Sequence, residues 1–144
     1  MKRFSLLIIF FCIFLYTNYA QNREDSIHIH HYDLHLNITD FSTHQIYGYT
    51  DLQVVSKVSS LSLITLDLQQ LVVDSIFVNG HAEPNYEQEG FKLYIHLENT
   101  LNQYDTAFLS IHYHGVPASD SYFGGFCFSG EYAYNMGVAF NDLP

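Results

Sequence analysis

Alternation of apolar and polar residues with a period of two constrains the fold of this chain more than any other feature. Successive side chains of a β-strand point to opposite sides, so this period is typical of strands that bury one face. We expect three such buried faces. Their apolar positions are Tyr32, Leu34, Leu36 and Ile38; Phe91, Leu93, Ile95 and Leu97; and Ala107, Leu109, Ile111 and Tyr113.

Further β-rich runs lie at 46–56, 61–68 and 72–78, and turn signals separate the runs. No segment has a convincing helical period. Asn79-Gly80 predicts a tight turn, whereas the acidic stretch after it suggests a longer loop. The fold class predicted from this pattern is all-β, as an antiparallel twisted sheet or a β-sandwich.

The first strand is expected to contain an irregularity. Ile27 and Ile29 occupy odd positions, whereas the apolar face from Tyr32 onward occupies even ones. A slip of one residue turns a strand inside out, so a β-bulge or a break near His30-His31 is predicted.

The first twenty residues are typical of a secretory signal peptide. Lys2 and Arg3 precede an apolar run over 4–16, and a small residue, Ala20, ends the segment. A membrane anchor is the alternative, but the run is shorter than the roughly 18–20 residues that span a bilayer. We expect cleavage after Ala20, export to the periplasm or the extracellular space, and no stable membrane anchor afterwards.

Residues 21–144 have the length of one domain with its own core. They retain Arg23, Lys57 and Lys92 as their basic residues against 15 acidic ones, a formal charge of −12. Such a surface repels nucleic-acid phosphates, which excludes nucleic acid as a partner. Cys127 is the one cysteine after residue 20, so an internal disulfide is impossible. A small buried core residue is the favoured interpretation of Cys127, with a reactive thiol as the alternative.

Nine histidines raise the possibility of a metal site. On a strand, residues two apart such as His112 and His114 share a face, but a third ligand would have to come from a neighbouring strand. The alternation indicates instead that histidines are the solvent-facing partners of apolar positions, at His35, His96 and His112. His31 and His35 have helical ligand spacing, but in a strand they lie about 13 Å apart, too far to share zinc.

The sequence holds no recognisable catalytic machinery. No histidine is followed by glutamate, so the His-Glu-x-x-His zinc motif is absent, and Ser129 lacks a glycine two residues before it. Glu83, Glu87 and Glu89 form the densest acidic group, which is interpreted as a solvated loop rather than a catalytic pair. We therefore predict no catalytic residue, no cofactor-binding residue and no metal ligand in this chain.

The stretch from 122 to 140 is rich in aromatic residues and glycine. So many aromatic side chains are typical of a ligand groove, of a surface that packs on another domain, or of a hydrophobic core. The sequence leaves interface and core equally open. The aromatic positions are Tyr122, Phe123, Phe126, Phe128, Tyr132, Tyr134 and Phe140.

An ordered set of segments resembles the N-terminal domain of aminopeptidase N-type zinc metallopeptidases. Tyr32-Asp33-Leu34, followed by a second strand that contains Gly48, is similar to the opening of that domain. The segments 66–80 and 106–115 resemble its later strands. The segments 124–130 and 132–137 look like the exported bacterial branch of the family. Each motif alone is weak, but together they cover 28–140, nearly all of the chain after residue 20.

The resemblance implies a twisted β domain that flanks a zinc-bearing catalytic domain. Relatives carry Gly-x-Met-Glu-Asn, His-Glu-x-x-His and a further glutamate ligand in that second domain, and none of these occurs here. Many relatives also have a glutamine near the last strand, whereas this chain has Val138-Ala139-Phe140-Asn141, so that role is not carried over. The parent reaction would be metal-dependent removal of N-terminal residues from peptides.

Two functional hypotheses follow. In the first, the chain is the non-catalytic N-terminal domain of a secreted zinc aminopeptidase, incomplete at its C-terminus and inactive alone. It would bind no cofactor itself. Its partner would be the missing catalytic domain, and peptide substrate would bind only in the full-length context. In the second, the chain is a free-standing secreted β-sandwich that binds a ligand through an aromatic surface.

Overall fold

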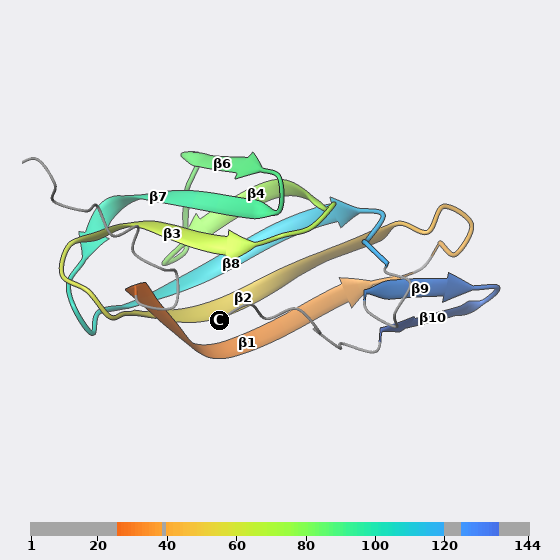
Figure 1. The fold of residues 1–144 in the computed structure, drawn as a ribbon, viewed down its shortest axis with the longest axis horizontal. Helices are drawn as coiled ribbons and strands as arrows, with labels where there is room; N and C mark the ends of the chain where they lie inside the picture. The colour runs from red at the N-terminus through yellow and green to blue at the C-terminus, as the bar shows by residue number, and fades with distance from the viewer. Residues whose placement is uncertain (1–25, 39, 120–124, 136–144) are drawn as a thin grey trace, which may run out of the picture.

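The computed structural model describes residues 26–38, 40–119 and 125–135 (Figure 1). The expected signal peptide at 1–20 lies outside these residues, and so do Tyr122, Phe123 and Phe140 of the aromatic stretch. Within the described part of the chain, no helix has the length and apolar character needed to cross a membrane.

The described residues form antiparallel β-strands, which confirms the predicted all-β class. The expected strand runs at 46–56, 61–68 and 72–78 correspond to strands β2, β3 and β4. The strands are β1 (Ile27–Asn37), β2 (Ile46–Ser56), β3 (Leu61–Asp67), β4 (Val72–Val78), β5 (His81–Ala82), β6 (Tyr86–Glu89), β7 (Lys92–Leu101), β8 (Thr106–Gly115), β9 (Phe126–Ser129) and β10 (Tyr132–Asn135).

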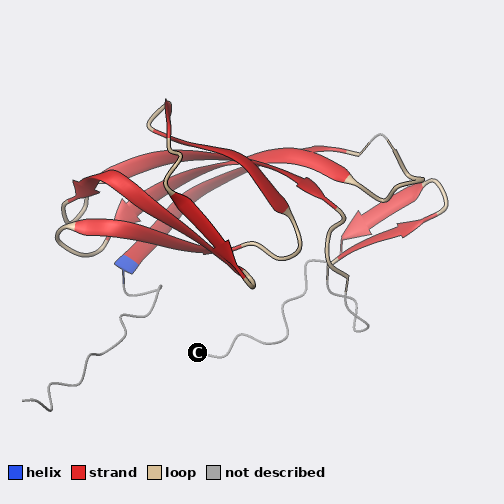
Figure 2. Cartoon of the chain, turned by 90° about the horizontal axis from the view of Figure 1, so that it is seen from above, coloured by secondary structure: helices blue, strands red, loops and turns tan. Residues whose placement is uncertain are grey.

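Two sheets of unequal width pack on each other. The larger sheet has the order β1-β2-β8-β4-β5 and is curved along its strands (Figure 2). The smaller sheet has the order β3-β7-β6, and a separate hairpin joins β9 to β10. Ile64 and Ile95 of the smaller sheet are fully buried in one core cluster with Leu109 and Ile76 of the larger sheet. The sandwich is thus held by apolar side chains from both inner faces.

The three predicted apolar faces differ in their burial. In β8 the whole face is buried, and in β7 Leu93 and Ile95 are at most 1% exposed, although Phe91 just before β7 is exposed. The face on β1 is different, since Tyr32 and Leu34 are each 59% exposed. The expectation of a buried face at β1 is therefore wrong, although the strand itself is present. β1 is an edge strand of the wider sheet. Its first apolar residues, Ile27 and Ile29, join or pack against the core, whereas Tyr32 and Leu34 do not.

Two local predictions are confirmed. The register between β1 and β2 shifts between Ile29 and His31, which is the expected irregularity at the entry. Val78 pairs with His81 across Asn79 and Gly80, whose φ angles are 51° and 80°. Positive φ at both central residues is the signature of a tight type I′ hairpin turn, so the longer loop considered as an alternative is not formed.

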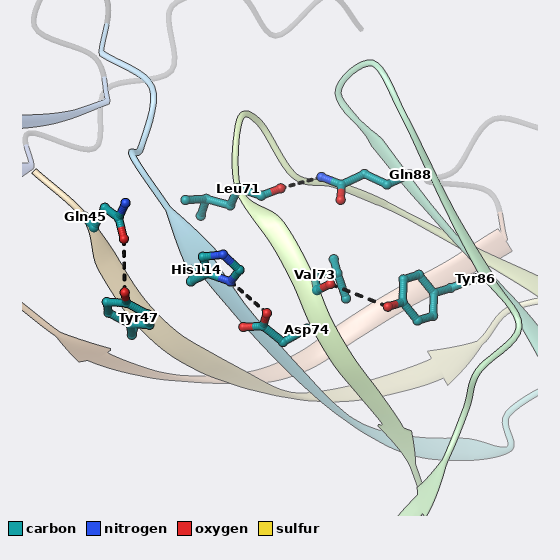
Figure 3. Close-up of polar contacts among 8 residues, drawn as sticks. All are labelled: Gln45, Tyr47, Leu71, Val73, Asp74, Tyr86, Gln88 and His114. Atoms are coloured by element: carbon teal, nitrogen blue, oxygen red, sulfur yellow. Dashed lines mark hydrogen bonds and ion pairs between the residues drawn. The ribbon is translucent and has the colours of Figure 1, made fainter. Parts of the chain in front are cut away.

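The two sheets are linked by polar contacts near β4, on the side of the sandwich away from β1. The hydroxyl of Tyr86 in β6 donates to the carbonyl oxygen of Val73 in β4, at 3.5 Å (Figure 3). The side-chain amide of Gln88 donates to the carbonyl oxygen of Leu71, just before β4. These bonds hold β6 over β4.

Glu83 departs from its expected place in a solvated loop. Its side chain is buried, whereas Glu87 and Glu89 are exposed as expected. One carboxylate oxygen accepts the backbone N–H of Asn85 at 3.1 Å, and the other accepts that of Glu98 at 3.4 Å. Buried carboxylates require such partners, so Glu83 serves as a structural anchor between the 83–85 segment and β7.

We expect Glu83→Ala to lower the free energy of unfolding by about 1–3 kcal/mol, because two backbone N–H groups lose their acceptor. Urea unfolding followed by circular dichroism measures the change. The exposed Glu89→Ala variant is the control and should stay within about 0.5 kcal/mol of the wild type. Equal stability of the Glu83→Ala protein and the control would contradict the anchoring role.

Gly48 in β2 lies where the backbone of β1 passes very close. A Cβ atom added at Gly48 would lie 2.5 Å from the carbonyl oxygen of His35 and 3.0 Å from Cδ2 of Leu36. It would also lie 3.3 Å from the ring of Tyr113 in β8. Backbone cannot yield as a flexible side chain does, so glycine is required at this position for close pairing of β1 with β2.

Gly48→Ala should therefore lower the free energy of unfolding by about 1–3 kcal/mol through overpacking, with β1 displaced from β2. Chemical denaturation measures the loss. Ser62→Ala, at an exposed position of β3, is the matched control and is expected to be nearly neutral. A Gly48→Ala protein as stable as the control would show that β1 has room to move.

Candidate functional site

A groove lies on the inner side of the larger sheet, next to β1. Its volume is about 490 Å³. Tyr32 and Leu34 of β1 form one side, while Leu66 and Leu68 belong to β3 and the residues just after it. The lining is mostly apolar. Its remaining members are Ile27, Ile29, Thr50, Leu52, Asp67, Leu71, Leu93, Ile111 and Tyr113.

The polar atoms at the floor of this groove are already paired. The hydroxyls of Thr50 and Tyr113 lie 3.0 Å apart and form a buried hydrogen bond between β2 and β8. Within the described residues, no buried side-chain nitrogen or oxygen lacks a partner. The groove thus offers apolar contact area without a converging set of free polar groups, which is unlike a typical small-molecule site.

The outer face of the same sheet carries rows of histidine and aromatic rings. The ring of Tyr49 in β2 stacks on His35 of β1 at 4.2 Å between centroids and on His112 of β8 at 5.1 Å. In the next row, Tyr47 stacks on His114 at 5.8 Å. Nδ1 of His114 also lies 2.7 Å from a carboxylate oxygen of Asp74 at β4, as Figure 3 shows.

These contacts bear on whether the histidines of the outer face could bind a metal ion. His112 is packed against Tyr49 and Phe77, and a carboxylate already holds His114. Over residues 26–38, 40–119 and 125–135, no three histidine, cysteine or acidic side chains come together in a way that could hold a metal ion. The described residues therefore do not fit a zinc ion.

The other histidines of the first strand lie apart from these rows. His28, His30 and His31 are exposed. His31 and His35 both belong to β1, as the sequence interpretation of their spacing required. His35, His96 and His112 lie on outward faces, with His96 and His112 half-buried. What the sequence could not reveal is the stacking across strands, because it depends on the strand register.

The β9–β10 hairpin divides the aromatic stretch between its two faces. Phe126 and Phe128 are half-buried and pack against the core cluster, whereas Tyr132 and Tyr134 are 77% and 50% exposed. The core interpretation is thus met in part by β9, whereas an interface through the exposed tyrosines of β10 stays a prediction. Cys127 is half-buried, not buried in the core as expected, because β9 lies outside the sandwich.

A turn anchored by Asp40 brings the β1–β2 connection to this hairpin. The hydroxyl of Ser42 donates to the Asp40 carboxylate at 2.6 Å, and the hydroxyl of Thr43 donates at 3.1 Å. These hydrogen bonds lower the pKa of the Asp40 carboxyl, and the bond from the Ser42 side chain contributes most to the shift. The connection places His44 in a stack on Phe128 at 4.9 Å and Phe41 edge-on to the same ring.

This arrangement of strands resembles that of known proteins at the level of solved structures. No family model matches the sequence, and no curated protein matches it significantly. Solved structures do match. The M1 zinc metallopeptidase from Deinococcus radiodurans is 29% identical, with a TM-score of 0.59 over 65% of this chain and 21% of its own.

Two further structures resemble the chain. A two-domain M1 zinc metallopeptidase bound to L-tryptophan is 26% identical, with a TM-score of 0.67 over 76% of this chain and 26% of its own. The Legionella pneumophila aminopeptidase A, solved with aspartic acid, shares the fold at 17% identity and a TM-score of 0.56, over 73% of this chain and 12% of its own. The chain thus spans about a quarter or less of these enzymes. By its strands and by this likeness, the described part of the chain resembles an N-terminal domain of M1 zinc metallopeptidases.

Proposed function

We propose that the chain is the non-catalytic N-terminal β domain of an exported zinc aminopeptidase. The parent enzyme would remove N-terminal residues from peptides in a metal-dependent reaction. The observation that carries the proposal is the likeness of the described sandwich to a small part of much larger M1 zinc metallopeptidases. Within that enzyme, the domain would supply packing surface and shape rather than reacting groups.

The residues of the chain support this division of labour. Zinc activates a water molecule for attack on a carbonyl and needs histidine or carboxylate ligands with an open position. His35, His112 and His114 are engaged in stacks and carboxylate contacts instead. The 144 residues also contain neither His-Glu-x-x-His nor Gly-x-Met-Glu-Asn. Metal and general base would therefore belong to the remaining part of the enzyme.

Export rests on residues 1–20 alone. The basic start, the apolar run and the small residue Ala20 have the order that a secretory signal requires. A free-standing binding module remains the second candidate, but no observation favours it, since the matching structures are larger peptidases.

The purified chain should have no aminopeptidase activity. Residues 21–144 would be incubated with aminoacyl p-nitroanilides, with and without added Zn²⁺, beside a zinc aminopeptidase as positive control. We expect release of nitroaniline at the rate of buffer alone, because no described group can hold the metal. Zinc-dependent turnover by this chain, removed by a chelator, would overturn the proposal.

Export is checked by expressing the complete chain in a bacterial host and determining the N-terminus of the product by mass spectrometry. The expected product begins at Gln21 and is found outside the cytoplasm. Replacing Leu7 and Ile8 by arginine should block both cleavage and export by interrupting the apolar run. An uncleaved cytoplasmic product from the unaltered chain would count against export.

A further inference from the structure

The inner side of β1 is a large apolar surface that the described sandwich does not cover. Tyr32, Leu34 and Leu36 alternate along β1 and are 59%, 59% and 38% exposed. Their register partners on β2 are Leu52, Thr50 and Gly48, of which Leu52 and Thr50 are buried. The apolar face thus continues from the core onto β1, where water replaces the second layer. Exposed contiguous apolar area of this kind marks an interaction surface.

The outer edge of β1 is the second open feature. In the larger sheet β1 pairs with β2 on one side, and no described strand pairs with its other side. Edge strands are commonly protected by bulges, prolines or lysines. The irregularity in β1 is confined to Ile29–His31, and the regular run from His31 to Asn37 contains neither proline nor lysine. Seven residues of regular edge are enough to template another strand.

The groove beneath β1 indicates which side chains an added strand would carry. It measures about 490 Å³ and runs from Tyr32 and Leu34 to Leu68 and Leu71, beyond the end of the smaller sheet. The hydroxyls of Thr50 and Tyr113 on its floor bond to each other, and most of the lining is apolar, so the groove suits apolar side chains. A strand on the β1 edge would direct every second side chain toward this side of the sheet.

We propose that a β-strand from the remaining part of the enzyme adds to the free edge of β1 and fills this groove with its apolar side chains. The partner class rests on the proposed function, since the chain spans 21% and 26% of the M1 metallopeptidases that it resembles. Backbone hydrogen bonds along β1 would supply affinity. The groove would select side chains at alternate positions.

A second copy of the chain fits this surface less well. Each copy would bring a formal net charge of −10 to the interface, and two β1 edges paired about Asp33 would set the two Asp33 carboxylates directly opposite each other. Like charges opposite each other in a sheet are destabilising. A strand of different sequence avoids this repulsion.

The isolated chain allows a first test with the dye anilinonaphthalene sulfonate, which binds exposed apolar surface. Leu34→Lys should remove most of the dye fluorescence of the wild-type chain. Phe108→Lys is the matched control, because Phe108 is also 59% exposed but belongs to the outer face of β8. Circular dichroism checks that both variants fold. Equal dye binding by both variants would overturn the claim that the β1 face is the open apolar surface.

The second test uses the longer parent enzyme that the proposed function implies. There, Leu34→Lys should lower the Tm by at least about 4 °C, whereas in residues 21–144 alone it should change the Tm little. Phe108→Lys should have little effect in both. Equal effects of Leu34→Lys in the long and short proteins would overturn strand addition. Failure of the longer polypeptide to cleave peptides, in contrast, would overturn the proposed function and leave this comparison valid.

Discussion

The unequal width of the two packed sheets is the constraint on which the rest of this structure depends. The polar bonds of Tyr86 and Gln88 hold the three-stranded sheet near β4, and the core between the sheets centres on Ile64, Ile95 and Leu109. A narrow sheet held at one side of a wide sheet leaves the other side uncovered. That uncovered side is β1, and its apolar face is therefore the main unsatisfied surface of the described domain.

The sequence predicted the strands well because alternation reports directly on which side of a sheet each side chain points. It also located the bulge, since Ile29 and Tyr32 differ in parity. Alternation carries no information on whether a second layer covers the face. Leu34 and Leu109 stand in the same pattern, yet one is 59% exposed and the other 1%. This difference is set by the packing of whole sheets, which no local pattern records.

The candidate sites show the same limit. The stacks of His35, Tyr49 and His112 join three strands, so their existence depends on the register of two pairings. Likewise, Glu83 reads as one of three acidic residues in a loop, although its partner Glu98 lies on a strand 15 residues away. The family resemblance succeeded where local patterns failed, because an ordered series of motifs reports on the whole fold. The need for glycine at position 48 is likewise set by strand pairing, because an added Cβ atom would lie 2.5 Å from the carbonyl oxygen of His35 on β1.

In the described domain, His35, His112 and His114 are engaged in aromatic stacks or carboxylate pairs, and an apolar groove lies beside the edge strand β1. Hydrogen exchange of the amides from His31 to Asn37, compared between this chain and the proposed parent enzyme, tests the account most directly. We predict that the amides facing away from β2 exchange quickly in the isolated chain and become strongly protected in the enzyme. Equally fast exchange of these amides in both proteins would contradict the account.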